Sequence, residues 1–426
     1  MTLKRNRAFA VVGAASVLAL AACSSPGGGG GDAQDVPGVT EDKIVIGTHQ
    51  PLTGPAAAGF SSISAATSAY FDYINDNGGI NGREIEFIVK DDGYNPANTQ
   101  TVVRDLVLQE EVFAILGGLG TPTHSAVIDF LNENEVPDLF VSGGSPMWDQ
   151  PEKYPWTFGY NSEYIAEAAI LAQYAQQEMP DGTYCMFGQD DDFGDDFEKG
   201  ALEILGADGL AASERYSVAN QDVTAQISAL KAANCDVVFL ASINGFTALA
   251  VGTAAQLGFF PQWMATSAGG DYGTLEKDYL QENAPLLLEN FISTFYLSLE
   301  TNQDDPWVEH FQMVQDEYNG GGEIGGNDIF GMNMAYMFAE ALAAAGENPT
   351  RESIVEAIES GAVKGSGLVP LGYSPEDHTG NTGVQLSQVK SGVQAYFGAP
   401  YVYENGEVTE YTGGQVPFEN GIPGSN

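Results

Sequence analysis

Basic side chains are scarce in this sequence. Its 426 residues include 15 lysines and arginines against 58 aspartates and glutamates, a formal net charge of −43 at pH 7. A surface with this charge repels nucleic acids and anionic lipid headgroups, so neither is expected as a partner. The acidic residues are spread along the whole chain, so the charge by itself points to no particular ligand.

Residues that bind metals or carry out catalysis are also few. The sequence has four histidines, at His49, His124, His310 and His378. Their spacing matches no metal site, and the run Asp190 to Asp192 lacks the glycine and the distal glutamate of a calcium-binding loop. Neither a Gly-x-Ser-x-Gly turn nor a His-Glu-x-x-His motif occurs. We therefore predict no enzyme activity, no metal and no cofactor.

Long apolar runs are confined to the N-terminus. Ala8 to Ala22 follows three basic residues and is shorter than the ~20 apolar residues needed to cross a membrane. A basic start and a short apolar run are typical of a secretory signal peptide, which we predict for residues 1–22. The later run Met332 to Ala345 is short and carries Glu340, which favours a buried helix.

The end of this first run resembles a lipoprotein processing site. Leu20-Ala21-Ala22-Cys23 places small residues directly before a cysteine, as in a bacterial lipobox. The resemblance implies that Cys23 carries lipid and anchors the mature chain outside the cytoplasmic membrane. The alternative is an ordinary secretory signal with a chance cysteine at its end. The glycines Gly27 to Gly31 predict a flexible tether over residues 23–42, and with no strand before them they predict no phosphate-binding loop.

The first part of the mature chain alternates strands and helices. Strands are predicted at 43–47, 85–89, 112–116 and 138–141, and helices at 61–77, 98–109 and 124–133. The pattern then restarts, with strands at 183–187, 212–217, 237–241 and 262–266, and helices at 164–178, 193–205, 223–233 and 246–257. This alternation predicts an α/β fold with two Rossmann-like lobes, because strands that alternate with helices form parallel sheets covered by helices.

The last part of the chain returns to the first lobe. Helices are predicted at 306–318, 329–345 and 351–360, and strand-like pieces at 384–390 and 395–403. The late helices have no strands of their own, so the predicted first lobe comprises residues 43–158 and 290–362, and the second lobe residues 159–289 and 363–426. The chain would cross a hinge several times. Ligands bind beyond the carboxyl ends of parallel strands, so a cleft between the lobes is the expected site.

Two cysteines remain besides Cys23. Cys185 and Cys235 fall on or beside predicted strands of the second lobe. In an oxidising compartment they form a disulfide or stay as two buried thiols, and the sequence leaves both open.

Six segments, in this order and spacing, resemble one known family. They are Ile44-Val45-Ile46-Gly47 leading into Pro51-Leu52-Thr53-Gly54-Pro55, the stretch Ile74 to Arg83, Asp91-Asp92-Gly93-Tyr94-Asn95-Pro96, Gly120-Thr121-Pro122-Thr123, Tyr154-Pro155-Trp156-Thr157 and Asp191-Asp192-Phe193-Gly194. From Lys43 to at least Gly346 the chain resembles the type I periplasmic binding proteins of the leucine/isoleucine/valine-binding class. The resemblance implies the type I periplasmic binding fold and capture of a small solute.

The resemblance also implies a ligand site on the first lobe. In this family hydroxyls and backbone N–H groups at strand ends hold the carboxylate of the ligand. Thr121, with Pro122 beside it, matches the first hydroxyl position. Ser142 to Ser145 matches the second segment, with Ser145 the expected hydroxyl and Ser142 and Gly144 beside it. Such groups suit a desolvated anion, and glycine lets the backbone approach closely.

On the second lobe, Phe193 matches an aromatic position that closes over the ligand, and Asn244 follows a strand end. Phe60 and Tyr160 are expected wall residues, the alternative for each being packing in a lobe core. Amino-acid binders of this class hold the ligand's ammonium with an acid on this lobe, but the matching place falls near Ser267. Asp271, or one of the aspartates 190–192, is the expected substitute.

These features predict a lipid-anchored, extracytoplasmic solute-binding protein. We expect its ligand to be a branched-chain amino acid, an aromatic acid or a small amide, delivered to the permease subunits of an ABC importer. The alternative is a ligand-sensing module of the same fold that docks on a membrane receptor.

Overall fold

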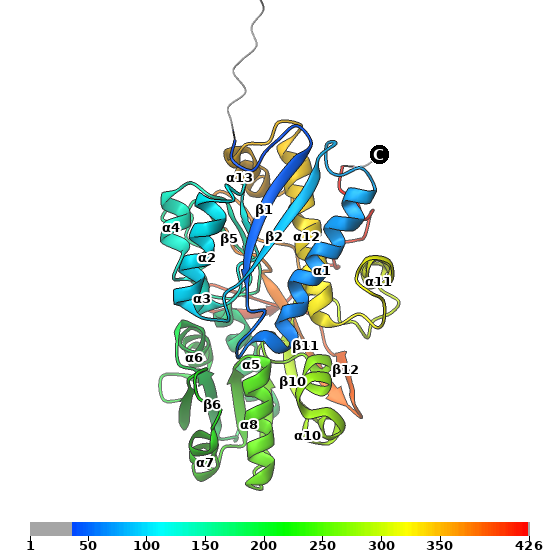
Figure 1. The fold of residues 1–426 in the computed structure, drawn as a ribbon. Coiled ribbons are helices and arrows are strands. Elements are labelled where there is room, and N and C mark those ends of the chain that lie inside the picture. The colour runs from blue at the N-terminus through cyan, green and yellow to red at the C-terminus, as the bar shows by residue number, and fades with distance from the viewer. Residues whose placement is uncertain (1–35, 425–426) are drawn as a thin grey trace, which may run out of the picture. The chain divides into compact units, whose positions relative to one another are not determined.

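The computed structural model describes residues 36–424, which form two lobes, each built on a β-sheet (Figure 1). The predicted signal peptide, Cys23 and most of the predicted tether lie outside the described residues. The tether was expected to reach residue 42, but the ordered body begins earlier: the N–H of Val45 donates to the carbonyl of Gly38, and that of Thr40 to Lys43. Within the described residues, no helix is both long enough and apolar enough to cross a membrane.

The first lobe contains a five-stranded parallel sheet in the order β2-β1-β3-β4-β5. Its strands are β1 (Lys43–Gln50), β2 (Glu84–Asp91), β3 (Ile115–Leu116), β4 (Asp138–Val141) and β5 (Thr157–Gly159). Its helices are α1 (Ala57–Asp76), α2 (Pro96–Leu108), α3 (Thr121–His124), α4 (Ile128–Glu133), α11 (Pro306–Tyr318), α12 (Gly326–Ala345) and α13 (Arg351–Glu359), with a 3-10 turn at Pro146–Trp148. The connection after β1 leads to β2 at one edge of the sheet, whereas the connections after β2 lead toward the other edge. Because such crossovers are right-handed, α1 covers one face of the sheet, and α2 and α4 cover the other (Figure 1).

Alternating side chains on β1 explain why helices cover both faces of this sheet. Ile44 and Ile46 are buried in the larger core, to which α1 and α12 also contribute. Val45, between them, packs into a separate core with Val103 and Leu106 of α2. Successive side chains of a strand point to opposite faces, and burying one such residue fully stabilises the fold by about 1.5–3 kcal/mol.

The second lobe contains a nine-stranded sheet in the order β14-β13-β11-β10-β9-β8-β6-β7, with β12 paired to β11. The parallel strands are β6 (Tyr184–Gln189), β7 (Ala212–Tyr216), β8 (Val237–Ala241), β9 (Gln262–Ala265) and β10 (Ile292–Phe295). The antiparallel additions are β11 (Gly383–Lys390), β12 (Val393–Tyr396), β13 (Tyr401–Glu404) and β14 (Glu407–Glu410). The helices are α5 (Tyr164–Glu178), α6 (Asp192–Leu205), α7 (Thr224–Ala232), α8 (Asn244–Gln256), α9 (Tyr272–Thr274) and α10 (Ala284–Leu287), with a π-helical turn at Leu275–Leu280 and a 3-10 turn at Gln281–Asn283.

A disulfide ties two neighbouring strands of the second sheet. Cys185 on β6 is bonded to Cys235, which stands just before β8. The two strands pair in parallel although 50 residues separate the cysteines. The structure therefore decides between the two alternatives that the sequence left open, in favour of the disulfide.

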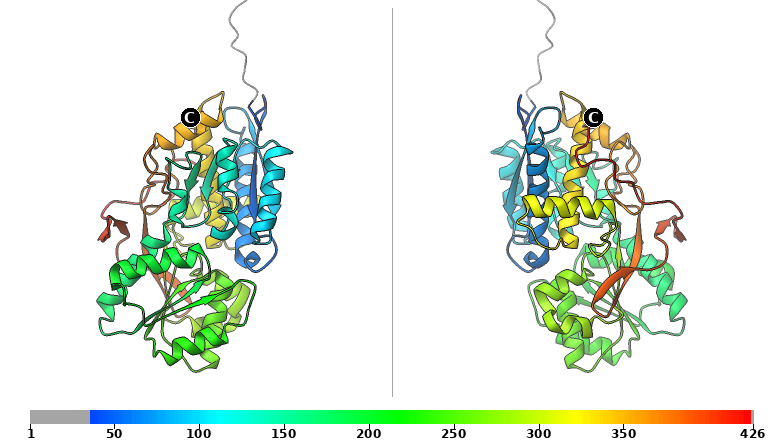
Figure 2. Two further views of the ribbon diagram at one scale, coloured as in Figure 1. Left: turned by 90° about the vertical axis from the view of Figure 1, so that its left-hand side faces the viewer. Right: turned by 90° about the vertical axis from the view of Figure 1, so that its right-hand side faces the viewer.

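The chain crosses between the lobes at residues 160–163, 296–305 and 360–382, near the three places that the predicted lobe bounds imply, and its last segment adds a further crossing. Residues 292–295 were expected in the first lobe, but strand β10 pairs with β9 and β11 and therefore lies in the second sheet. The last segment of the chain was expected in the second lobe, but its residues bond to the first. Trp307 Nε1 donates to the carbonyl of Val416 and Tyr70 Oη to that of Gly421, both at 2.8 Å. The C-terminal end thus packs on the first lobe (Figure 2).

Most predicted elements are confirmed with shifts of a few residues at their ends. The predicted helix at 124–133 is instead two short helices, α3 and α4, separated at Ser125 to Val127. The apolar run at 332–345 is buried within α12, as its length and its glutamate indicated.

Candidate functional site

One pocket lies where the carboxyl ends of the parallel strands of both lobes meet. The first lobe contributes Leu119 and Gly120 after β3, Ser142 after β4 and Asn161 after β5, together with Phe60, Ile63 and Tyr94. The second lobe contributes Tyr164, Phe193 after β6, Ile243 after β8, Ser267, Ala268 and Asp271 after β9, and Phe295 to Glu300 at the end of β10. Gly326, Asn327 and Phe330 come from α12. The pocket holds about 830 Å³ of space, part of it open to solvent, and it confirms that both sets of strand ends face one site.

Two polar atoms at the first-lobe end of this pocket have no hydrogen-bond partner. They are Ser142 Oγ and Asn161 Oδ1. The backbone at Ser142 is fixed, because its N–H donates to Gly118 O and its carbonyl accepts from the N–H of Gly120, each at 3.0 Å. Since buried polar atoms are rarely left unpaired, the hydroxyl of Ser142 is available to a polar group of a ligand.

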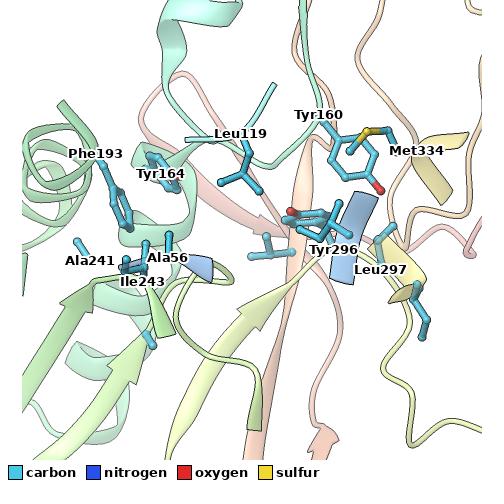
Figure 3. Packing of buried hydrophobic residues seen from close by; sticks show 14 of the residues in the cluster. Ala56, Leu119, Tyr160, Tyr164, Phe193, Ala241, Ile243, Tyr296, Leu297 and Met334 are labelled. Carbon is cyan, nitrogen blue, oxygen red and sulfur yellow. The ribbon is translucent and has the colours of Figure 1, made fainter. Parts of the chain in front are cut away.

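Aromatic side chains form the walls between the two ends. Phe193 lies against Tyr164 with ring centroids 4.1 Å apart, and Figure 3 shows the two side chains next to each other, with Leu119 beyond Tyr164. Phe193 is held at the start of α6, where the carboxylate of Asp191 accepts its N–H at 3.1 Å. Asp191 therefore caps a helix and also accepts a hydrogen bond from Gln189 Nε2 at 2.6 Å.

Asp271 and Glu300 make the opposite end of the pocket acidic. Asp271 Oδ1 accepts the N–H of Thr274 at 2.6 Å, which leaves Oδ2 without a partner. Glu300 Oε2, at the end of the β10 segment, is also buried and unpaired. Burial and the charge of Asp271 raise the pKa of Glu300 to about 8, and burial raises the pKa of Asp271. A cation placed beside these oxygens would stabilise their ionised forms, because opposite charges at close range favour ionisation.

A third acid stands behind the pocket wall, beside the place where the family pattern expects one. Glu167 on α5 accepts hydrogen bonds from Ser267 N at 2.7 Å, from Ser267 Oγ at 2.9 Å and from Thr294 Oγ1. Burial raises the pKa of Glu167 to about 7. Because both of its oxygens are engaged and it does not line the pocket, Glu167 fixes the Ser267 loop and leaves Asp271 and Glu300 as the acids that face a ligand.

The structure brings four of the sequence-predicted residues to the pocket surface: Phe60, Ser142, Phe193 and Asp271. Thr121 and Pro122 begin α3 beside Gly120, but neither lines the pocket. Asn244 begins α8 next to the lining residue Ile243, and its Oδ1 is buried without a partner.

The other predicted residues have structural partners. Gly144 O accepts the N–H of Tyr164 at 2.7 Å. Ser145 Oγ donates to Asp196 Oδ2 at 2.8 Å, so the expected hydroxyl of the ligand site instead bonds one lobe to the other. Tyr160 lies behind Phe330, with ring centroids 4.5 Å apart, and donates to the Phe330 carbonyl at 3.1 Å.

A buried chain of hydrogen bonds supports the loop that ends in Gly120. It runs from Asp92 Oδ2 to His49 Nδ1 (2.8 Å), from His49 Nε2 to His124 Nδ1 (3.0 Å) and from His124 Nε2 to Asp138 Oδ2 (2.8 Å). A Cβ atom on Gly118 would stand only 2.4 Å from the His124 ring and 2.5 Å from that of His49, so the loop lies directly on the two rings. The two histidines therefore position the pocket and do not line it.

Several of the lining residues that sequence reasoning missed follow one strand. Tyr296, Leu297 and Glu300 line the pocket from the end of β10, a strand that was not predicted. The signal was present as a short apolar run, Phe291 to Leu299, that ends in an acid at the carboxyl side of a strand.

Known proteins share this fold and much of this sequence pattern. The profile of the periplasmic binding protein family matches residues 43–394. A Leu/Ile/Val-binding protein homolog 1 of Brucella suis is 23% identical over 325 residues, which cover 75% of this chain and 84% of the relative. A leucine-, isoleucine-, valine-, threonine- and alanine-binding protein of Pseudomonas aeruginosa is 21% identical and covers 54% of this chain and 62% of its own length.

Solved structures with the same fold include two with different solutes in their descriptions. A branched-chain amino acid ABC transporter protein from Thermus thermophilus with bound valine superposes with a TM-score of 0.74 at 19% identity, covering 86% of this chain and 98% of that one. A fatty acid ABC transporter substrate-binding protein from Thermomonospora curvata gives a TM-score of 0.75 at 19% identity, covering 88% and 96%. The family match spans most of the chain and the pocket lies between two lobes of the expected type I fold, so this chain belongs to the periplasmic binding protein family and is a solute-binding protein, not an enzyme.

Proposed function

We propose that this protein is the capture component of an ABC importer, that lipid on Cys23 anchors it outside the cytoplasmic membrane, and that it takes a small carboxylate with an apolar body. The observation that carries the proposal is the pocket itself. It is built from the strand ends of both lobes, with an unpaired hydroxyl on Ser142 at one end and aromatic walls beyond it. A carboxylate at Ser142 would accept a charge-assisted hydrogen bond, and the walls would cover the apolar part.

The relatives support this class of solute without fixing its identity. Their descriptions name branched-chain amino acids in most cases and a fatty acid in one. Each of these solutes combines a carboxylate with an apolar part. A branched-chain amino acid and an aromatic acid both belong to the proposed class, and a small amide, which offers a carbonyl oxygen in place of a carboxylate, is the alternative solute.

The ligand would act by stabilising the closed arrangement of the lobes. Several hydrogen bonds already join the lobes near the pocket, among them Ser145 Oγ to Asp196 Oδ2 at 2.8 Å and Gln189 Nε2 to Tyr94 Oη at 3.3 Å. A solute that contacts Ser142 on one lobe and Phe193 on the other binds the closed form more tightly than an open one. It therefore shifts the equilibrium toward closure by that difference in affinity, and the closed form would dock on the permease.

A thermal-shift screen of the mature protein with Cys23 replaced tests this function. The panel contains branched-chain amino acids, benzoate-type acids and short amides. A ligand at 100 times its dissociation constant should stabilise the fold by about 2.7 kcal/mol. The matched variant Ser142→Ala should weaken binding about tenfold, since it removes one hydrogen bond to a charged group. A ligand whose affinity is the same for Ser142→Ala and the parent protein would contradict the proposed orientation.

The alternative role, a sensor that docks on a membrane receptor, predicts the same ligand binding but a different partner. Co-purification of the lipidated protein with permease subunits, increased by ligand, supports the importer. Capture of a receptor in their place supports the sensor.

A further inference from the structure

Helix α12 runs along the pocket from its acidic end to its hydroxyl end. Gly326, Asn327 and Phe330, from the first turns of the helix, line the pocket, and Met334 comes one turn further on. Residues four apart lie on the same face of a helix. The α12 face from Gly326 to Met334 therefore allows the acidic end and the hydroxyl end of the pocket to be located along the helix axis.

The acidic end lies at the first residue of this face. A Cβ atom on Gly326 would stand 2.6 Å from Asp271 Oδ2 and 3.6 Å from Glu300 Oε2, the two buried oxygens that have no partner. Both carboxylates thus converge on one point, and only a glycine at 326 leaves room there. Asp271 is 5% exposed, so bulk water screens its charge only weakly.

The hydroxyl end lies two helical turns away. Met334 Sδ is 2.2 Å from the place of a Cβ on Gly117, and Ser142 Oγ is 3.5 Å from the same place. Eight residues separate Gly326 from Met334, which corresponds to about 12 Å along the helix axis. Ser142 Oγ therefore lies near the level of Met334 and Asp271 Oδ2 near that of Gly326, so the two ends are at different levels of the helix.

The α12 face carries Phe330 between the two ends, and among the described residues no charged side chain lines the pocket besides Asp271 and Glu300. Phe60, Tyr296 and Leu297 also line it, so much of its wall is apolar. In an α-amino acid the ammonium and the carboxylate share one carbon, so such a ligand reaches one end of this pocket and leaves the other unpaired. Leaving a buried charge without a partner is costly.

We propose that the pocket takes an elongated solute whose cationic amine is at the opposite end from its carboxylate, an ω-amino acid or a similar amphoteric chain, with the amine between Asp271 and Glu300. This proposal rests on the proposed function and narrows its solute class. The groups around the pair reinforce the preference for a cation: Asp278 and Asp328 add negative charge near Asp271, and Lys277 is the one base that interacts with Asp328 in this region of the described chain.

Isothermal titration with matched isomers tests the proposal. The probes are ω-aminohexanoate and ω-aminooctanoate, with norleucine and leucine as α-amino isomers of the first, hexanoate as the acid without an amine, and hexylamine as the amine without an acid. We expect an ω-amino acid to bind at least tenfold more tightly than norleucine. The double variant Asp271→Asn/Glu300→Gln should lose about 10- to 100-fold in affinity for the ω-amino acid and nothing for hexanoate, since it removes bonds to a charged group.

The exposed acid Asp208, which does not line the pocket, is changed to Asn as the matched control and should leave affinity within about twofold, because surface charges contribute little. Leucine or norleucine binding as tightly as the ω-amino acids overturns the proposal while leaving the proposed function standing. Hexanoate binding as tightly as ω-aminohexanoate also overturns it, because the amine would then contribute nothing. Failure of every probe overturns it too, and if the wider panel of carboxylates also fails, the proposed function falls with it.

Discussion

Removing the disulfide between Cys185 and Cys235 should lower the free energy of unfolding by a predictable amount. The bond closes a loop of 50 residues. In the chain-entropy treatment such a loop restricts the unfolded chain enough to stabilise the folded one by about 4 kcal/mol. Both cysteines are buried, Cys185 on β6 and Cys235 just before β8, and these two strands already pair, so the reduced protein can keep its fold while its unfolded state gains freedom.

The assay is urea unfolding of the mature protein with Cys23 replaced, followed by circular dichroism with and without reductant. The reduced protein should unfold at lower urea concentration, with the difference in free energy near the 4 kcal/mol estimate. The variant Cys185→Ala/Cys235→Ala serves as the matched control, because it should show the low stability and no response to reductant.

Two results would refute this reasoning. Titration of two free thiols in protein unfolded without reductant would show that the bond does not form. Alternatively, an intact bond whose reduction leaves the unfolding midpoint unchanged would show that the loop entropy is not what the bond contributes.

Three further predictions concern the pocket and its support. The pKa of Glu300 is raised from 4.5 to about 8, so between these pH values the folded protein holds a proton that the unfolded chain releases. The free energy of unfolding should therefore fall as pH rises from 4.5 to 8. The variant Glu300→Gln should remove that loss, so its melting temperature should exceed that of the parent protein at pH 8 and differ little at pH 4.5. His124→Phe leaves the buried Asp138 without its histidine partner and should cost about 3–5 kcal/mol in urea unfolding, and a loss below 1 kcal/mol would show the hydrogen-bonded chain to be unimportant. Ser145→Ala removes a bond between the lobes worth about 1 kcal/mol, so any ligand should bind about fivefold more weakly, with a larger radius in X-ray scattering before ligand is added; unchanged affinity would mean that the bond does not hold the lobes closed.

The regular elements could be predicted because their patterns are local. β1 alternates Ile44, Val45 and Ile46 toward two cores, and α6 buries Phe193, Phe197 and Ala201 at helical spacing. Strand β10 was not predicted because it is only four residues long and pairs with β11, whose sequence lies about 90 positions later. The packing of the C-terminal segment on the first lobe was not predicted for a similar reason, since its hydrogen bonds join it to Tyr70 and Trp307, which are far away in the chain.

The site was predictable in part. Phe193 and Asp271 follow strand ends that the sequence places at the cleft, and the structure has them there. Ser145 has the right residue type, but its hydroxyl meets Asp196 of the other lobe, a contact between elements that no local pattern specifies. Glu300 was missed because its strand was missed, and Glu167 because an acid inside a helix gives no sign that a distant loop donates to it.

The repeated crossing of the chain has a consequence for how this protein is made. The strands of the first sheet are complete by Gly159, but one face of that sheet is covered only in part, by α1, until α12, which begins at Gly326, has been synthesised. The second sheet in turn waits for β11, which begins at Gly383. Domains usually fold one after another as the chain emerges, and contacts between distant residues slow folding. Neither lobe here can finish first, so a chain moved across a membrane from its N-terminus onward would stay unfolded until nearly all of it had emerged.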